Sequence, residues 1–159
     1  MAIRIGINGF GRIGRLVYRI GMEQGSEFVA VNDLFPADNL AYLLKYDTMH
    51  RQFMLNGKAA EISAVADEKG GSFTVNGHVT RTMAVKDPGQ LPWKDLGVNY
   101  VLESTGLFTD FEKANLHVTA GAKRVLLTVP PKDEVDAMVV MGVNEHTLKA
   151  EHKVISNAS

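Results

Sequence analysis

Short apolar runs alternate with amphipathic stretches along most of the chain. Runs rich in Val, Ile and Leu predict buried strands: Ile3–Asn8, Phe28–Asn32, Tyr100–Ser104, Arg124–Thr128, Ala137–Gly142 and Val154–Ser156. Apolar residues at helical spacing predict helices in three intervening stretches: Arg12–Met22, the segment opened by Pro36-Ala37-Asp38, and Asp110–Ala120. This alternation is typical of an α/β domain with a mostly parallel sheet.

The stretch from Tyr46 to Asp87 follows a different pattern. Phe73–Val75 and Val79–Val85 flank an Asn76-Gly77 pair, which is typical of a β-hairpin with a type I′ turn. Residues Gln52–Gly71 show no clear period. We therefore expect a small antiparallel hairpin insertion between the two halves of the parallel sheet.

A glycine-rich turn links the first predicted strand to the first predicted helix. Gly9, Gly11 and Gly14 form G-x-G-x-x-G in the order strand, turn, helix, which is the context that gives this motif its meaning. The first glycine permits a tight turn, the second admits a pyrophosphate, and the third lets helix and strand pack closely. Free N–H groups at the helix start then face the anion. The pattern predicts a Rossmann-like, doubly wound dinucleotide-binding domain.

An acidic residue completes this pattern. Asp33 stands 19 residues after Gly14, at the end of the predicted strand Phe28–Asn32. A carboxylate there accepts hydrogen bonds from the ribose hydroxyls and repels a 2′-phosphate, so the expected cofactor is NAD rather than NADP. As a common turn residue, Asp33 could instead only shape the loop.

Composition narrows the class of protein. The chain has 159 residues, 17 basic against 18 acidic side chains, and no cysteine. This length fits one domain over residues 1–159, and the balanced charge disfavours nucleic acid as a primary partner. No run of apolar residues is long enough for a membrane span, and residues 1–10 do not read as a signal peptide. We expect a cytoplasmic globular domain.

The remaining candidate residues favour structural roles. The five histidines lack metal-ligand spacing, so no metal site is expected. His117 is expected on the helix that covers the sheet, and Trp93 is expected to anchor a loop. The acidic run Lys132–Asp136 follows two prolines and predicts a solvated loop.

Further motifs follow in a fixed order: LLKYDTMH (Leu43–His50), KDP (Lys86–Pro88), ESTGLF (Glu103–Phe108), AGAKRVLLT (Ala120–Thr128) and VISNAS (Val154–Ser159). Together with GINGFGRIGR and VNDL, they resemble the N-terminal, NAD-binding half of phosphorylating glyceraldehyde-3-phosphate dehydrogenases. The resemblance covers essentially the whole chain. It implies the cofactor half of the glycolytic oxidoreductase that converts D-glyceraldehyde 3-phosphate to 1,3-bisphosphoglycerate and reduces NAD.

The resemblance also implies roles for individual residues. The phosphate turn and its flank would be Asn8, Gly9, Phe10, Gly11, Arg12 and Ile13. The adenosine would lie against Asn32, Asp33, Leu34 and Lys86. Thr105 and Gly106 would guide the cofactor between its halves, and Thr128 would border the nicotinamide.

By the same resemblance, the nucleophilic cysteine would follow directly after Ser159, which matches a substrate-binding serine. No catalytic residue is therefore expected within the chain. It would need a C-terminal catalytic half to act and would be inactive alone; the complete family enzyme is a homotetramer. Two alternatives remain, the cofactor half of an erythrose-4-phosphate dehydrogenase and a non-catalytic NAD-binding or interaction module.

Overall fold

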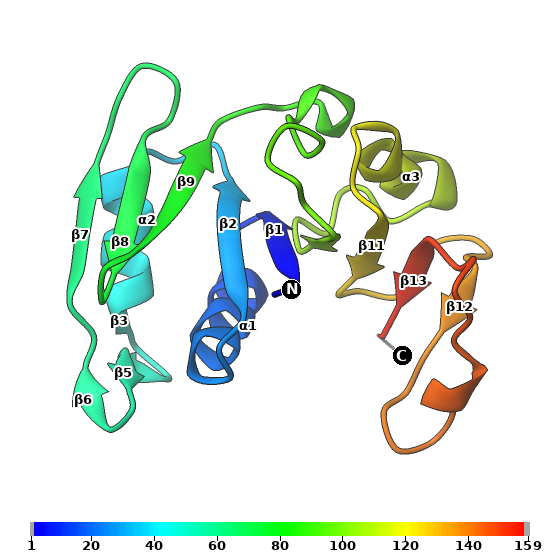
Figure 1. The fold of residues 1–159 in the computed structure, drawn as a ribbon, viewed down its shortest axis with the longest axis horizontal. Helices are drawn as coiled ribbons and strands as arrows, with labels where there is room; N and C mark the ends of the chain where they lie inside the picture. Colours follow the sequence, from blue (N-terminus) through cyan, green and yellow to red (C-terminus); the bar gives the residue numbers. More distant parts are fainter. Residues whose placement is uncertain (1, 158–159) are drawn as a thin grey trace.

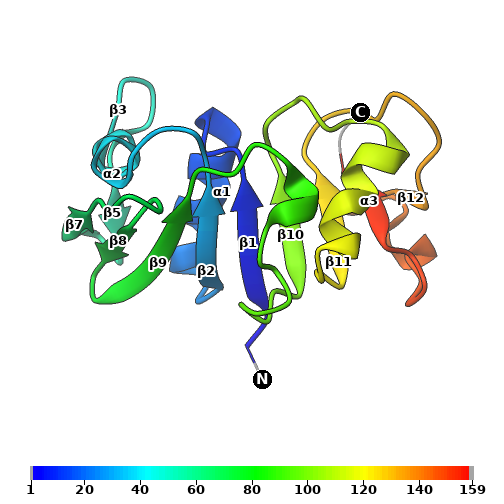
Figure 2. The ribbon, with the colours of Figure 1, turned by 90° about the horizontal axis from the view of Figure 1, so that it is seen from above.

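The computed structural model describes residues 2–157, and its centre is a nine-stranded sheet (Figures 1 and 2). In chain order, the strands of this sheet are β1 (Arg4–Asn8), β2 (Glu27–Asn32), β7 (Ile62–Val65), β8 (Ser72–Val75), β9 (His78–Met83), β10 (Tyr100–Glu103), β11 (Arg124–Leu127), β12 (Ala137–Met138) and β13 (Val154–Ser156). In space they follow the order β12-β13-β11-β10-β1-β2-β9-β8-β7.

The middle of the sheet is parallel. Strands β9, β2, β1, β10, β11 and β13 are neighbours in that order, and each adjacent pair runs parallel. Counted along the chain among these six, the order is 3-2-1-4-5-6, the arrangement of a doubly wound dinucleotide-binding sheet. In such sheets ligands bind beyond the carboxyl ends of the strands, at the point beside β1 where the strand order reverses. The predicted α/β fold class is confirmed.

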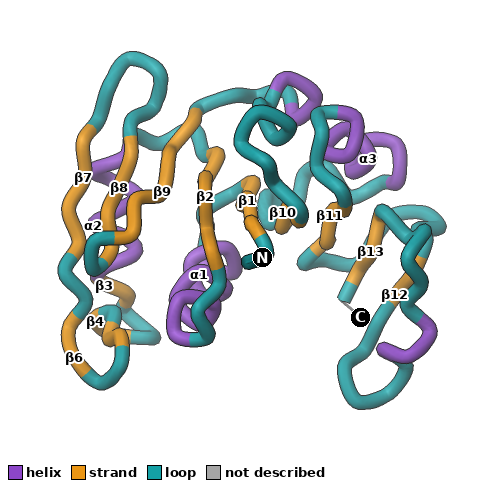
Figure 3. The backbone as a smooth tube through the Cα atoms, in the orientation of Figure 1, coloured by secondary structure: helices purple, strands orange, loops and turns teal. Residues whose placement is uncertain are grey.

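In the described part of the chain, three α-helices cover the two faces of the sheet: α1 (Arg12–Glu23), α2 (Ala37–Lys45) and α3 (Phe111–Thr119). Neighbouring strand residues point to opposite faces, so Val31 packs with the buried residues of α1 and α2, whereas Ala30 packs with those of α3. The segment between β9 and β10 is mostly loop, with one short 3₁₀ helix, η1 (Pro88–Gln90) (Figure 3). Trp93 in this segment is fully buried, as the sequence predicts for a loop anchor.

The predicted hairpin forms, but its place in the sheet corrects the prediction. Asn76 and Gly77 both have positive φ angles, of 47° and 84°, and Val75 pairs with His78 across the two-residue turn. Strand β9 also pairs in parallel with β2, so it is itself the third strand of the parallel sheet. The antiparallel part therefore lies at the edge and not between two halves. It is extended by β7, which pairs with β8.

Two further regions also differ from the sequence prediction. Residues within 46–59 form two small antiparallel pairs, which periodicity did not predict: β3 (Tyr46–Asp47) with β4 (Arg51–Gln52), and β5 (Met54–Leu55) with β6 (Lys58–Ala59). Of the predicted strand Ala137–Gly142, only Ala137–Met138 pairs with β13. A second 3₁₀ helix, η2 (Glu145–Thr147), follows. No helix among residues 2–157 is long and apolar enough to cross a membrane.

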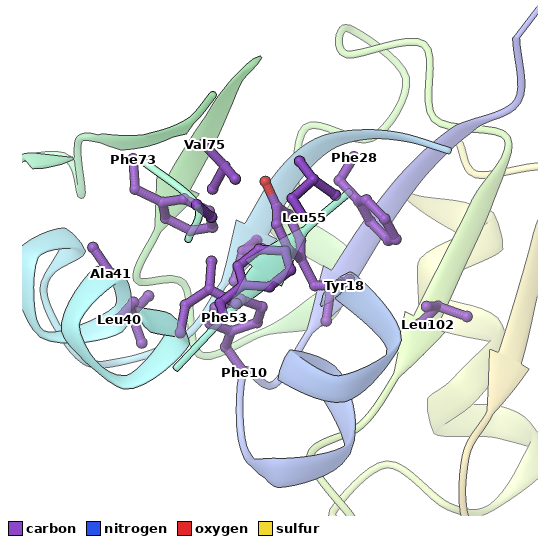
Figure 4. Packing of buried hydrophobic residues seen from close by; sticks show 14 residues of the cluster. Phe10, Tyr18, Phe28, Leu40, Ala41, Phe53, Leu55, Phe73, Val75 and Leu102 are labelled. Carbon is purple, nitrogen blue, oxygen red and sulfur yellow. The ribbon is translucent and has the colours of Figure 1, made fainter. Parts of the chain in front are cut away.

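Aromatic side chains join α1 to the sheet (Figure 4). Tyr18 of α1 lies against Phe28 of β2, with ring centroids 4.7 Å apart, and Phe10 stacks on Phe73 of β8 at 5.6 Å. The Tyr18 hydroxyl is paired with the Thr80 hydroxyl at 2.9 Å, so this buried polar group is satisfied. The cluster fixes the helix that starts at the glycine turn.

Burial of Tyr18 predicts a loss of stability in alkali. Burial raises the pKa of Tyr18 to about 12 from its ordinary value of 10. Between these values the phenol ionises in the unfolded chain but not in the folded one, so the free energy of unfolding falls as the pH rises, by about 2 to 3 kcal/mol in total. Urea unfolding from pH 9 to 12 measures the fall. Tyr18→Phe should remove this part of it, whereas Tyr42→Phe, at an exposed ring, should not.

Candidate functional site

A groove of about 520 Å³ opens at the carboxyl ends of β1, β2 and β10. It lies where doubly wound sheets bind ligands. The residues that line it come from these strand ends and the loops that follow them: Asn8, Gly9, Gly11, Asn32, Asp33, Leu34, Phe35, Val85, Lys86, Ser104, Thr105, Leu107 and Phe108.

The glycine turn between β1 and α1 forms one wall of this groove. Gly9 has a φ of 89°, and a Cβ there would lie 2.7 Å from the backbone nitrogen of Thr105. A Cβ on Gly14 would lie 2.3 Å from the carbonyl oxygen of Gly9, so α1 packs directly on the turn. A Cβ on Gly11 would meet no atom within 4 Å. The first and third glycines are thus required by packing, and the second faces open space.

The start of α1 is suited to an anion. Within the described chain, the helix has no side-chain cap at Gly11 and no acidic residue in its first turn. The first N–H groups of a helix have no partner inside it, and the helix dipole adds partial positive charge there. Arg12 and Ile13 form this exposed first turn. The arrangement favours a phosphate group, as the motif predicts.

Asp33 directly follows β2 and is held by two backbone groups. The N–H of Phe10 donates to its Oδ2 atom at 2.7 Å, and the N–H of Phe35 donates to its Oδ1 atom at 3.2 Å. A carboxylate has about four acceptor positions, so each oxygen can accept a further hydrogen bond. Asp33 is half-buried and lines the groove. Its carboxylate therefore keeps acceptor positions open beside the glycine turn.

Buried polar side chains form the floor of the groove and the layer beneath it. The Asn32 amide donates to Asn8 Oδ1 at 2.7 Å, and the Asn8 amide donates to Glu103 Oε2 at 2.7 Å. The backbone N–H of Thr105 donates to the other oxygen of Glu103 at 2.9 Å. Glu103 is fully buried, and sequence analysis assigned it no role. Its position at the end of β10, a predicted strand, was the available signal.

Apolar side chains form the rim. Leu34, Phe35 and Leu107 are exposed by 60, 61 and 69%, which is high for large apolar groups in the part of the chain described. A planar aromatic ligand placed between them would cover this surface. Sequence analysis named Leu34 and missed the other two, because loop residues follow no period that predicts where their side chains point.

The structure brings most of the predicted residues together. Those that line the groove are Asn8, Gly9, Gly11, Asn32, Asp33, Leu34, Lys86 and Thr105. The Phe10 ring instead lies in the core, and only its backbone reaches the groove. Gly106 is exposed beside Thr105, and the Thr128 hydroxyl donates to the Glu103 carbonyl oxygen at 3.1 Å. Ser159 lies outside the described residues.

The histidines are distributed over the molecule. His50 lies 3.2 Å from Asp47, His78 contacts the Phe28 carbonyl oxygen at 2.7 Å, and His117 is fully buried on α3. Among residues 2–157, no group of three or more His, Asp or Glu side chains could hold a metal ion.

The sheet order, the glycine turn and Asp33 define a dinucleotide-binding domain of the Rossmann type. Residues 3–111 match the family described as "Glyceraldehyde 3-phosphate dehydrogenase, NAD binding domain". The chain belongs to the glyceraldehyde-3-phosphate dehydrogenase family and carries its NAD-binding domain.

Curated relatives support this assignment. The chain is 50% identical over 159 residues to glyceraldehyde-3-phosphate dehydrogenase of Thermotoga maritima, covering 98% of this chain and 45% of the relative. It is 47% identical over 163 residues to the chromosomal enzyme of Cupriavidus necator and 45% identical over 160 residues to the cytosolic enzyme of Trypanosoma brucei brucei. All of this chain aligns with each of these two, and 46% and 45% of their own lengths are covered. The chain thus spans about half the length of these relatives.

Gly14 of α1 and Gly11 at its N-cap should respond differently to substitution by alanine. Alanine has the higher helix propensity by about 1 kcal/mol, but at Gly14 the clash with Gly9 dominates, and we expect a net loss of about 1 to 3 kcal/mol in the free energy of unfolding. Gly11→Ala should lose less stability than Gly14→Ala, because its methyl group meets no atom within 4 Å and only the preference of a helix N-cap for glycine over alanine is lost. We expect this variant to bind NAD about tenfold more weakly, because the methyl group takes up space that is open to the ligand. Urea unfolding and calorimetric titration measure both. Equal effects of the two variants on stability would contradict the close packing of Gly14 against Gly9.

Proposed function

We propose that the groove binds NAD, with the pyrophosphate on the turn Gly9–Ile13 and the adenosine ribose on Asp33. One observation carries this proposal: the Phe10 N–H holds the Asp33 carboxylate at 2.7 Å, so that the ribose acceptor and the phosphate turn form one unit. In a dinucleotide, ribose and pyrophosphate are covalently adjacent, so a site for both must hold its two parts at a fixed spacing.

The adenine lies, in this proposal, between the apolar rim and Lys86. Leu34 and Phe35 follow Asp33 directly and line the groove together with Leu107. Their exposed surfaces gain free energy when a flat base covers them. Lys86 and Val85 lie on the segment after β9, which also lines the groove, and Val85 is fixed by hydrogen bonds of its N–H and carbonyl groups to the Asn32 side chain, at 2.9 and 2.8 Å. The adenine site is thus anchored to the groove floor.

The charge of Asp33 predicts a preference for NAD over NADP. The 2′-phosphate of NADP would lie at the Asp33 carboxylate, and two like charges in a half-buried site repel strongly. The ribose hydroxyls of NAD would instead donate to the free acceptor positions of Asp33. The same side chain therefore attracts one cofactor and excludes the other.

Substitution of Asp33 tests this preference. Asp33→Ala should weaken NAD binding about tenfold or more, since a charged acceptor for ribose is lost, and should reduce the ratio of NAD to NADP affinity. Asp33→Asn keeps the shape and an acceptor for the Phe10 N–H but removes the charge, so NADP affinity should rise relative to the unmodified chain. Calorimetric titration with both cofactors measures the ratio. Equal affinity of the unmodified chain for NAD and NADP would refute the assignment.

We further propose that residues 1–159 serve as the cofactor half of a phosphorylating glyceraldehyde-3-phosphate dehydrogenase. The relatives that carry this name are about twice as long as the chain. In this proposal Thr105, Gly106 and Thr128 guide the nicotinamide end, and Ser159 contributes to the substrate site. The nucleophilic cysteine, the catalytic half and the tetramer contacts lie in the remaining sequence. The chain alone then binds NAD but oxidises no aldehyde.

Mixing the chain with a catalytic half tests whether the two parts together restore activity. The chain mixed with a polypeptide comprising the remaining half of the Thermotoga maritima relative should reduce NAD when glyceraldehyde 3-phosphate and phosphate are added. Either part alone should be inactive. As a matched control, the mixture made with Gly11→Ala should show a raised KM for NAD. Reduction of NAD by the chain alone would contradict the proposal, and inactivity of a well-folded mixture would favour a non-catalytic NAD-binding module.

A further inference from the structure

A buried carboxylate lies directly beneath the groove. Glu103, at the end of β10, is fully buried together with His117 of α3 and Trp93 of the loop before β10. Its two oxygens accept hydrogen bonds from Asn8, His117 and Thr105, the last through both its N–H and its hydroxyl group. Four donors therefore satisfy a charge that would otherwise be very costly to bury.

The first chain of donors starts at the backbone of Val85. Its N–H donates to Asn32 Oδ1 at 2.9 Å, and its carbonyl oxygen accepts from Asn32 Nδ2 at 2.8 Å. Because a backbone cannot exchange these roles, the Asn32 amide has one permitted orientation. Asn32 Nδ2 then donates to Asn8 Oδ1, and the amide nitrogen of Asn8 must point to Glu103 Oε2. The direction of donation is thus determined for every hydrogen bond from Val85 to Glu103.

The second chain starts at Trp93. An indole N–H can only donate, and it donates to His117 Nδ1 at 3.0 Å. His117 Nδ1 therefore carries no proton, and the ring proton lies on Nε2, 2.7 Å from Glu103 Oε2. Both chains end as donors on this one oxygen. Only a hydrogen-bond acceptor at the Oε2 position can therefore satisfy both Asn8 and His117.

We propose that Glu103 is a positioning residue for the dinucleotide, acting through Asn8 and Thr105. This inference rests on the proposed binding of NAD in the groove. Asn8, Asn32, Val85 and Thr105 all line the groove, whereas Glu103 does not touch it. By accepting hydrogen bonds from Asn8 and Thr105, the carboxylate fixes the positions of two groove-lining residues relative to each other.

Backbone hydrogen bonds connect these residues to the glycine turn. The N–H of Gly9 donates to the Asn32 carbonyl oxygen at 2.9 Å, and the N–H of Ser104 donates to the Asn8 carbonyl oxygen at 2.7 Å. A Cβ on Gly9 would also lie within 3 Å of Thr105. The turn therefore lies tightly against Asn32 and Thr105 and continues directly from Asn8. Because Glu103 binds both Asn8 and Thr105, a change in these hydrogen bonds displaces the N–H groups that face the pyrophosphate in this proposal.

Glutamine at position 103 has the same shape but the wrong hydrogen-bond polarity in either orientation. With its amide nitrogen at the Oε2 position, it meets the donors of Asn8 and His117. With the nitrogen at the Oε1 position, it meets the N–H of Thr105. Each orientation leaves a groove-lining donor without its acceptor, so the loss reaches the binding site and not only the core.

Glu103→Gln should therefore raise the dissociation constant for NAD about tenfold or more in chain that is fully folded by circular dichroism. Thr80→Val is the matched control. Thr80 is also fully buried, and its hydroxyl bonds to Tyr18 at 2.9 Å and to the Phe28 carbonyl oxygen at 3.2 Å, but it does not line the groove. Its loss should lower stability and leave the dissociation constant within about twofold.

A spectroscopic measurement on the unmodified chain tests the same connection without a variant. Trp93 is the single tryptophan, so its indole N–H gives one resolved ¹⁵N resonance. NAD should shift this resonance, although Trp93 is fully buried and does not line the groove, because Glu103 and His117 connect it to Asn8. In Glu103→Gln saturated with NAD, the shift should be lost or strongly reduced.

The outcomes separate the two proposals. If the unmodified chain binds no NAD, the proposed function fails. If it binds NAD and folded Glu103→Gln binds equally or more tightly, the positioning role alone is overturned. Equal weakening by Glu103→Gln and Thr80→Val would also overturn it, since a general loss of stability would then explain both. Should Glu103→Gln fail to fold, an NAD-insensitive Trp93 resonance in the unmodified chain overturns the role.

Discussion

The hydrogen bond from the Phe10 N–H to the Asp33 carboxylate joins the apolar core to the groove. The Phe10 ring packs against Tyr18 and Phe73 in the interior, whereas its N–H group reaches the end of β2 and holds Asp33 at 2.7 Å. Core packing therefore determines where the carboxylate lies relative to the glycine turn. A dinucleotide site needs this precision, because its ribose and phosphate subsites must match a covalent spacing.

The groove is supported by polar groups as well as by the core. Burying the Glu103 carboxylate is compatible with a stable fold only because four donors satisfy it. An apolar residue of similar size would avoid that requirement. It would, however, leave Asn8 and Thr105 without partners at the wall of the groove. The structure thus retains a charged group whose hydrogen bonds all lead towards the ligand site or to the buried pair of His117 and Trp93.

Sequence reasoning predicted the features that depend on local pattern. The parallel strands, the Asn76-Gly77 turn, the glycine motif and the place of Asp33 after its strand all follow from short-range spacing. The parallel pairing of β9 with β2 was missed, because it depends on a contact between segments about 50 residues apart. Glu103 was missed as a functional candidate for a similar reason. Thr105 stands two residues after it, but the donors Asn8 of β1 and His117 of α3 are distant in the sequence, and nothing beside Glu103 reveals them.

One measurement tests most directly whether NAD lies at the carboxyl ends of β1, β2 and β10. Amide resonances of the ¹⁵N-labelled chain are followed during titration with NAD. We expect the largest shifts at Gly9, Phe10, Gly11 and Asp33 and in the segment after Glu103, with the hairpin turn at Asn76-Gly77 unchanged. Shifts concentrated elsewhere, or none at saturating NAD, would contradict it.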